Sequence, residues 1–224
     1  MPAGDAGVLF DVDGTLVDTA YLHTVCWSEA LRQVGRTVAM NHIHRGIGMG
    51  SAELLDHLLG AQRSHDQDET VKASHLALYK QHWGRLQKLP GAVELLRRCR
   101  HSNLAVVLAS SASDEELSAL RSALDADDLI TASTSSGDAD SAKPAPDILH
   151  AALERSGLDP ERTVFVGDSV WDGAASARAG LTFIGLTCGG TSLAELTHAG
   201  AVEVWQDPAD LLAHFADSAI GAAT

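Results

Sequence analysis

Residues 7–10 (GVLF) form a short apolar run that leads directly into residues 11–15 (DVDGT). Such a run predicts a buried strand, which the Gly-Thr pair then ends. Carboxylates just beyond a buried strand lie where open α/β sheets bind ligands. On an extended backbone Asp11 and Asp13 project to the same side, so their charges repel unless a cation or a shared proton is present. A strand followed by an Asp-Gly turn explains the same residues, and this stretch alone leaves both interpretations open.

Apolar runs and amphipathic segments alternate along the rest of the chain. Buried strands are expected at residues 104–109, 163–166, 181–186 and 202–205, with a weaker one at 129–132. Helices are expected at residues 92–100, 148–156 and about 172–179, and a capping box from Ser113 to Glu116 opens another. Strands that alternate with helices predict an α/β fold with a doubly wound, Rossmann-like parallel sheet.

Residues 18–86 have a different pattern, with helical periodicity and no strand-like run. Helices are expected from Thr19 to about Gly35, over residues 52–59, and from Asp68 or Glu69 to about Leu86, with a polar segment and a loop at residues 40–51. The sequence therefore predicts an α-helical insert, residues 18–86, within a core of residues 1–17 and 87–224.

Composition excludes several classes of partner. The formal net charge of -14 argues against nucleic acid or an anionic membrane as the main partner, because both prefer a basic surface. The three cysteines are widely spaced and fit neither a disulfide framework nor a zinc site. The first residues lack the basic and apolar regions of a signal peptide, and no run is long enough to span a membrane. We therefore expect a cytoplasmic protein.

Polar side chains with complementary chemistry follow the expected strands. Asp11 and Asp13 follow the first, Ser110 the second and Asp168 the strand at 163–166, while Lys143 lies in a proline-containing loop. The carboxyl ends of parallel strands share one edge of a sheet, so these residues are expected to converge. Carboxylates suit Mg²⁺, Ser110 and nearby backbone amides suit phosphate oxygens, and a carboxylate nucleophile can form an aspartyl-phosphate.

Four segments carry a family resemblance: residues 11–18 (DVDGTLVD), 107–111 (VLASS), 141–147 (SAKPAPD) and 166–172 (VGDSVWD). With the helical insert, they resemble the haloacid dehalogenase superfamily of phosphohydrolases that have a small helical cap. The resemblance implies an enzyme acting on a small phosphorylated metabolite, as a monomer or homodimer.

The same resemblance assigns roles to individual residues. Asp11 would attack phosphorus, and Asp13 would protonate the leaving oxygen and later activate water. Ser110, Ser111 and Lys143 would hold the phosphoryl group. Mg²⁺ would be bound by Asp11, the backbone carbonyl of Asp13 and Asp168, with support from Asp172.

Alternatives remain within and beyond this family. Asp13 excludes the haloacid dehalogenases themselves and the phosphonate hydrolases, which lack an acid there. Similarity to phosphoglycolate and sugar-phosphate phosphatases is the leading interpretation, and a mutase resembling β-phosphoglucomutase is the alternative. His23 and Trp27 support the mutase, whereas Gly167 and Met49 depart from its pattern. A non-catalytic binding module is a third interpretation, and the complete set of polar residues argues against it.

Cap residues are expected to choose the substrate. The cap loop at residues 46–50 does not match a nucleotide-binding fingerprint and does not follow a strand. Arg45 is a candidate to bind a substrate anion, with a solvated surface arginine as the alternative. His23 is a candidate to approach the catalytic acid, with a hinge or surface contact as the alternative. His42 and His44 have no third ligand at a recognisable spacing, so a metal pair is not expected.

Overall fold

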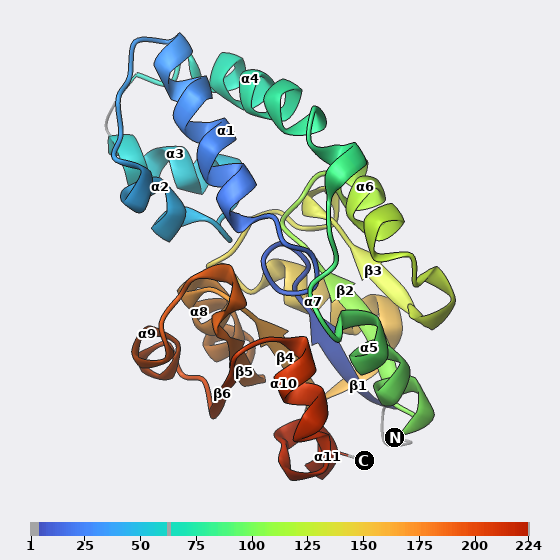
Figure 1. Ribbon diagram of the computed structural model, residues 1–224. Coiled ribbons are helices and arrows are strands. Elements are labelled where there is room, and N and C mark those ends of the chain that lie inside the picture. Colours follow the sequence, from blue (N-terminus) through green and yellow to red (C-terminus); the bar gives the residue numbers. More distant parts are fainter. Residues whose placement is uncertain (1–4, 62–63, 224) are drawn as a thin grey trace.

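The computed structural model describes residues 5–61 and 64–223, and it contains one sheet of six parallel strands. These strands are β1 (Asp5–Phe10), β2 (Ala105–Ala109), β3 (Ala132–Thr134), β4 (Leu158–Gly167), β5 (Thr182–Leu186) and β6 (Glu203–Trp205). Their spatial order is β3-β2-β1-β4-β5-β6 (Figure 1). The predicted doubly wound sheet is confirmed. The order reverses between β1 and β4, and ligands bind at such switch points.

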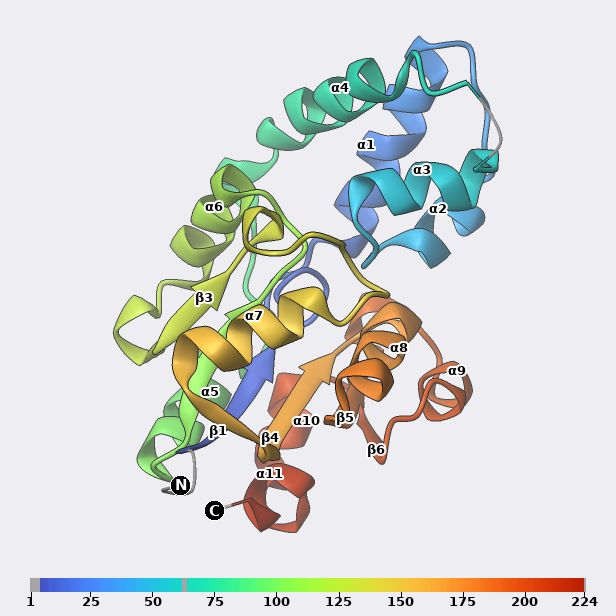
Figure 2. The ribbon, with the colours of Figure 1, turned by 180° about the vertical axis from the view of Figure 1, so that it is seen from behind.

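Helices cover both faces of the sheet (Figure 2). On one face lie α5 (Ala92–His101), α6 (Asp114–Leu124), α10 (Pro208–Ala213) and α11 (Ala219–Ala222). On the other lie α7 (Asp147–Ser156), α8 (Val170–Ala179) and α9 (Leu193–His198). The sheet is therefore buried between two layers, and this explains why its central strands are apolar at nearly every position.

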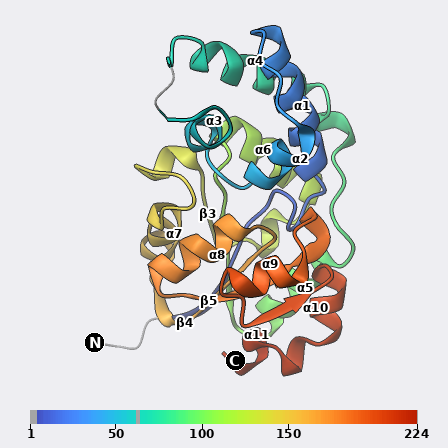
Figure 3. The same cartoon turned by 90° about the vertical axis from the view of Figure 1, so that its left-hand side faces the viewer.

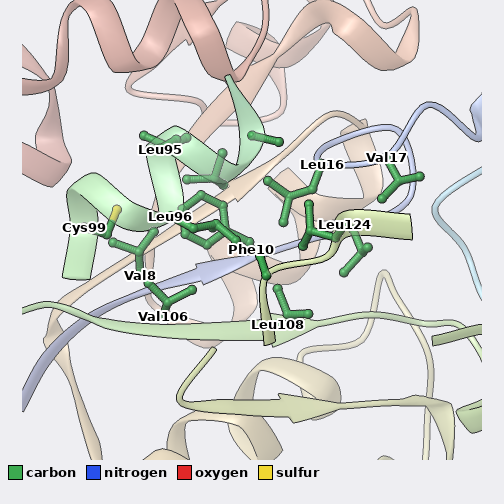
Figure 4. Packing of buried hydrophobic residues seen from close by; sticks show 14 of the residues in the cluster. Val8, Phe10, Leu16, Val17, Leu95, Leu96, Cys99, Val106, Leu108 and Leu124 are labelled. Atoms are coloured by element: carbon green, nitrogen blue, oxygen red, sulfur yellow. The ribbon is translucent and has the colours of Figure 1, made fainter. Parts of the chain in front are cut away.

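Alternate residues of β1 enter the two cores. Val8 and Phe10 belong to the cluster formed with α5 and α6, whereas Leu9 belongs to the cluster on the opposite face. Figure 4 shows Phe10 beside Leu96 of α5 and near Leu108 of β2. Burial on both faces fixes the register of β1, because a one-residue shift would exchange the two sets of side chains. The end of β1, which Asp11 follows, is fixed with it.

The chain between β1 and α5 is helical, as predicted, and forms a group with its own core. It comprises α1 (Ala20–Gln33), α2 (Met40–Gly46), α3 (Ser51–Leu59), α4 (Asp68–Lys80) and the 3-10 turn η1 (Trp83–Arg85). Trp27, Leu31, Ile43 and Leu55 are buried in that core. Figures 1 and 3 show the group beyond the carboxyl ends of the strands. The exact limits of a cap domain, residues 18–86, stay a prediction.

Several expected elements differ from the structure. The polar segment after residue 40 is helical, because Ile43 on one face of α2 packs into the cap core. Helix α4 ends at Lys80 rather than near Leu86, and the chain turns through η1, which contains the poor helix former Gly84. The weak strand expected at residues 129–132 lies further along, at β3, because pairing with β2 begins at Ala132.

Gly91 provides a test of the packing between α5 and α10. Its φ is +75°, and a Cβ there would lie 2.5 Å from the Cα of Ala209 and 2.7 Å from the Ala209 nitrogen. Gly35 has a similar φ of +73°, but nothing lies within 4 Å of its Cβ position. We expect Gly35→Ala to lower the free energy of unfolding by about 1–2 kcal/mol through backbone strain alone. Gly91→Ala should cost more, because α10 must also move. Equal losses in urea denaturation would contradict this packing.

Candidate active site

The carboxyl end of β1 delivers Asp11 to the switch point of the sheet. The Asp11 backbone N–H donates to the carbonyl of Val166 in β4 at 2.9 Å, so the chain is still held to the sheet at this residue. Ser110 follows β2 and donates its backbone N–H to the Thr134 carbonyl at 3.2 Å. Asp168 follows β4 directly. The structure thus brings the ends of three strands together, as the topology of a parallel sheet predicts.

Lys143 is fully buried and lies between two carboxylates. Its Nζ is 2.6 Å from Asp11 Oδ1 and 2.8 Å from Asp172 Oδ1, and it lies 5.2 Å from the centre of the Phe165 ring. Burial by itself lowers the pKa of Lys143, but the Asp11 and Asp172 carboxylates outweigh it and raise the pKa. The ammonium therefore stays charged and fixes one oxygen of Asp11.

Asp172 holds Lys143 while capping a helix. Its Oδ2 accepts hydrogen bonds from the Ser169 backbone N–H at 3.0 Å and from the Ser169 hydroxyl at 2.6 Å, which completes a capping box at the start of α8. This leaves Oδ1 facing Lys143. The supporting role that the family resemblance implied for Asp172 is compatible with this geometry.

Three buried carboxylates, those of Asp11, Asp168 and Asp172, place oxygen atoms within 4.8 Å of one another. The Thr15 hydroxyl lies 3.2 Å from Asp11 Oδ2 and 3.1 Å from Asp168 Oδ1, so it bridges two of them. Burial raises the pKa of Asp11 to about 7 against the opposing effect of Lys143, and burial together with Asp11 and Asp172 raises the pKa of Asp168 well above its usual value. One lysine does not balance three carboxylates.

Such a cluster fits a divalent cation with a preference for oxygen ligands. Mg²⁺ is bound in proteins by one or two carboxylates together with substrate phosphate oxygens. Two glycines also lie against Asp168: a Cβ at Gly189 would lie 1.6 Å, and a Cβ at Gly14 2.6 Å, from Asp168 Oδ2. Only glycine allows this close approach of the backbone to the carboxylate. The sequence analysis missed Gly189, although a Gly-Gly pair soon after a buried strand is a signal that could have found it.

The side chain of Asp13 is directed away from this cluster and toward the cap. Its Oδ1 accepts a hydrogen bond from the Thr19 hydroxyl at 2.7 Å and lies 3.1 Å from His23 Nε2. Burial tends to raise the pKa of Asp13, but the bonds from His23 and Thr19 outweigh it and lower the pKa. Thr19 occupies the N-cap position of α1 without capping it, because its hydroxyl is used by Asp13.

A second histidine, which the sequence analysis missed, supports His23. His23 Nδ1 lies 3.1 Å from Nε2 of His75, which is buried on α4 and stacks on Trp27 with ring centres 4.1 Å apart. Burial lowers the pKa of His75 to about 2, so this ring is neutral. Its spacing of four residues from Val71 and from Tyr79 was the available signal, since that spacing puts all three on the buried face of α4.

A small cavity of about 60 Å³ lies directly over Asp11. It is lined by Asp11, Asp13, His23, Trp27, Ile47, Gly48, Met49, Ser51, Leu54, His75, Ser111, Ala112 and Glu116. The Ser111 hydroxyl oxygen is buried and has no hydrogen-bond partner among the residues that the structure describes. The Ser110 hydroxyl accepts from the Ala112 N–H at 3.1 Å. Ser111 therefore lines the cavity beside Asp11 with a hydroxyl that is free to bind a ligand, whereas Ser110 does not line it.

The structure does not bring Arg45 into this cavity. Its guanidinium pairs with Glu195 of α9, and its carbonyl accepts a hydrogen bond from Trp171 Nε1 at 2.8 Å. His44 beside it lies 2.9 Å from the Gly189 carbonyl and stacks on Tyr21. In this conformation Arg45 joins α2 to the core through Glu195, a partner 150 residues further along the chain. Its candidate role in binding a substrate anion stays a prediction.

Comparison with known proteins identifies the family. The family model "haloacid dehalogenase-like hydrolase" matches residues 6–180, so the chain belongs to the haloacid dehalogenase-like hydrolases. The chain is 26% identical over 188 residues to a phosphoglycolate phosphatase from Pseudomonas putida, covering 81% of this chain and 69% of that protein.

Solved structures agree with this assignment. The crystal structure of a hydrolase from Pseudomonas syringae has a TM-score of 0.90 at 34% identity and covers 95% of this chain and 99% of its own. β-Phosphoglucomutase from Clostridium difficile has a TM-score of 0.83 at 19% identity, with coverage of 97% and 98%, and shows the same fold. The resemblance inferred from the four sequence segments is confirmed.

Mg²⁺ binding to the carboxylate cluster should be visible without any substrate. A ligand at about 100 times its dissociation constant stabilises a protein by about 2.7 kcal/mol. For a chain of this size, this corresponds to a rise of about 5–10 °C in the melting temperature. We expect that rise in the wild-type protein and its loss in Asp168→Asn. Asp128→Asn, which changes an exposed carboxylate, is the matched control and should keep it. The same Mg²⁺-dependent rise in Asp168→Asn would contradict the assignment.

Proposed function

We propose that this hydrolase is a Mg²⁺-dependent phosphatase of small phosphorylated metabolites, of the phosphoglycolate or sugar-phosphate type, and that Asp11 becomes transiently phosphorylated. One observation carries the proposal: a buried carboxylate at the switch point, fixed by Lys143 at 2.6 Å, lines a small cavity that a second carboxylate, Asp13, also lines. The relatives named phosphoglycolate phosphatase support the same reaction class.

The first half of the reaction would be in-line attack by Asp11 on phosphorus. The Asp11–phosphorus bond forms, the bond to the ester oxygen breaks, and that oxygen takes a proton. Asp13 and His23 share a proton across their 3.1 Å contact and lie on the cap side of Asp11, where the ester oxygen leaves. Their pair is the source of this proton, with Asp13 as the immediate donor.

The second half would reverse the role of Asp13. Its carboxylate accepts a proton from water, the water oxygen bonds to phosphorus, and Asp11 is released as a carboxylate. Thr19 and His23 hold Asp13 in position for both steps.

Charge balance at the phosphoryl group would come from several residues. Lys143 remains a fixed cation beside Asp11, and Ser110 and Ser111 offer hydroxyl groups. Asp11 and Asp168 would hold Mg²⁺, with the backbone carbonyl of Asp13 as the family resemblance implies. When bound, this ion supplies positive charge for the phosphoryl oxygens. Positioning and electrostatics of this kind account for most of the catalysis in phosphoryl transfer.

A cytoplasmic location and a monomeric or dimeric state belong to the same proposal. The three cysteines are free, and two of them are buried, which suits a reducing compartment. Over residues 5–61 and 64–223, no helix has both the length and the apolar character needed to cross a membrane.

Replacing the proposed nucleophile tests this function. Asp11→Asn should lower kcat for hydrolysis of p-nitrophenyl phosphate by at least about 10³-fold, because the reaction loses its covalent route. The fold, followed by circular dichroism, should be retained. Asp18→Asn changes an exposed carboxylate seven residues away and should keep nearly full activity. Activity of Asp11→Asn close to that of the wild type would remove Asp11 as the nucleophile.

A separate assay distinguishes the mutase alternative, which the contact between His23 and Asp13 keeps open. We expect incubation with β-glucose 1-phosphate to release phosphate, or to give no reaction, without forming glucose 6-phosphate. Both products are measured in the same sample. Conversion to glucose 6-phosphate faster than phosphate release would establish the mutase instead.

A further inference from the structure

The cavity over Asp11 surrounds the part of the substrate that departs with the ester oxygen, so its lining determines which alcohols are accepted. Four apolar side chains form much of the cap side: Trp27, Ile47, Met49 and Leu54. Its volume of about 60 Å³ is far below the roughly 300–1,000 Å³ of ordinary ligand pockets. Groups on the leaving alcohol that lie next to the ester oxygen therefore come close to these side chains.

No lysine or arginine is among the described residues that line this cavity. The nearest fixed cation, Lys143, lies beneath it and is already bound by Asp11 and Asp172. Arg45 does not line this cavity, and its guanidinium pairs with Glu195. Lys80 of α4 pairs with Glu115 at 2.7 Å and does not line the cavity.

The two histidines in the cavity do not replace a cation. His75 is neutral, because burial holds its pKa far below its usual range. His23 faces Asp13 at 3.1 Å, so any positive charge on its ring is balanced by that carboxylate. A second anionic group on a substrate, such as a carboxylate, therefore meets no unbalanced positive charge among these side chains.

Glu116 adds a negative charge to the same cavity. Its Oε2 is held by the Ser113 backbone N–H at 3.0 Å and the Ser113 hydroxyl at 2.7 Å. These bonds form the capping box at the start of α6 that the sequence predicted, and they fix the carboxylate in place. Oε1 makes no hydrogen bond within the described parts of the chain.

We propose that Glu116 is a specificity residue: it selects phosphate monoesters whose small leaving alcohol carries a hydroxyl or an ammonium group, and it disfavours those that carry a second anion. A hydroxyl or ammonium donates a hydrogen bond to Glu116, whereas a carboxylate is repelled by it and finds no cation in exchange. This inference rests on the proposed phosphatase function and narrows its substrate class toward polyol and amino-alcohol phosphates.

Three phosphate monoesters of equal length test the selection. 2-Hydroxyethyl phosphate, O-phosphoethanolamine and 2-phosphoglycolate differ mainly in the terminal group, which is a hydroxyl, an ammonium or a carboxylate. At fixed pH, ionic strength and Mg²⁺, we expect kcat/KM of the wild-type enzyme for each of the first two to exceed that for phosphoglycolate by at least about tenfold. A preference for phosphoglycolate would overturn the proposal.

The variant Glu116→Gln tests the effect of the Glu116 charge, because it removes that charge and keeps a side chain of similar size. Glutamine at this position still completes a capping box, so α6 should keep its first turn. We expect the ratio of kcat/KM for O-phosphoethanolamine to that for phosphoglycolate to fall by at least about tenfold. Glu115→Gln is the matched control, because Glu115 is the adjacent glutamate, pairs with Lys80 and does not line the cavity. In Glu115→Gln, the ratio of the two kcat/KM values should stay unchanged. An unchanged ratio in Glu116→Gln would also overturn the proposal.

p-Nitrophenyl phosphate separates this inference from the proposed function. Its leaving group has no second anion, so its hydrolysis depends on Asp11 and not on the selection. An enzyme that hydrolyses it but prefers phosphoglycolate is a phosphatase without the proposed selectivity. An enzyme inactive on it and on all three esters overturns the proposed function, and the inference with it.

Discussion

The contact of Lys143 with Asp11 and Asp172 is the interaction on which the rest of the site depends. Removing ions from water is costly, and a buried carboxylate without a partner is protonated or destabilises the fold. Lys143 is fully buried at 2.6 Å and 2.8 Å from these carboxylates, so it keeps charge at the switch point of the sheet. Within the part of the chain that the structure describes, no lysine forms an ion pair with Asp168. The imbalance of charge that makes the cluster suitable for a metal ion is therefore built into the fold.

The cap completes this site through residues that the core lacks. Thr19 and His23 hold Asp13, and His75 holds His23 from another cap helix. On the opposite side of the cap, His44 is bonded to the carbonyl of Gly189, whose backbone lies against Asp168. Helices α1 and α2 thus contact both the proposed acid/base residue, Asp13, and the loop beside the proposed metal site.

Much of this arrangement could be predicted from the sequence, because the geometry of a parallel sheet is simple. Apolar runs located the strands, and residues directly after them, such as Asp11, Ser110 and Asp168, had to meet at one edge. The local sequence pattern did not predict where β3 begins. This strand starts at Ala132 because that residue pairs with Val107 of β2.

Individual side-chain contacts between helices that are distant in the sequence could not be predicted from the sequence. Arg45 was a candidate to bind a substrate anion, and the sequence did not show that it pairs with Glu195 on a helix of the core. His75 meets His23 only because α1 and α4 pack together. Glu116 was recognised as part of a capping box, which is correct, yet the pattern could not show that the same side chain also borders the cavity. The spacing of apolar residues predicts which face of a helix or strand is buried. It does not predict which other element packs against that face.

The central claim is that Asp11 carries the phosphoryl group between two half-reactions that need different help from Asp13. The most direct measurement uses Asp13→Asn and p-nitrophenyl phosphate, whose leaving group departs without an acid. The account predicts a burst of about one nitrophenolate per enzyme, followed by a stall, because no base then activates water. Mass spectrometry after acid quenching should find the phosphoryl group on Asp11. Steady turnover without a burst, or a phosphoryl group on another residue, would contradict the account.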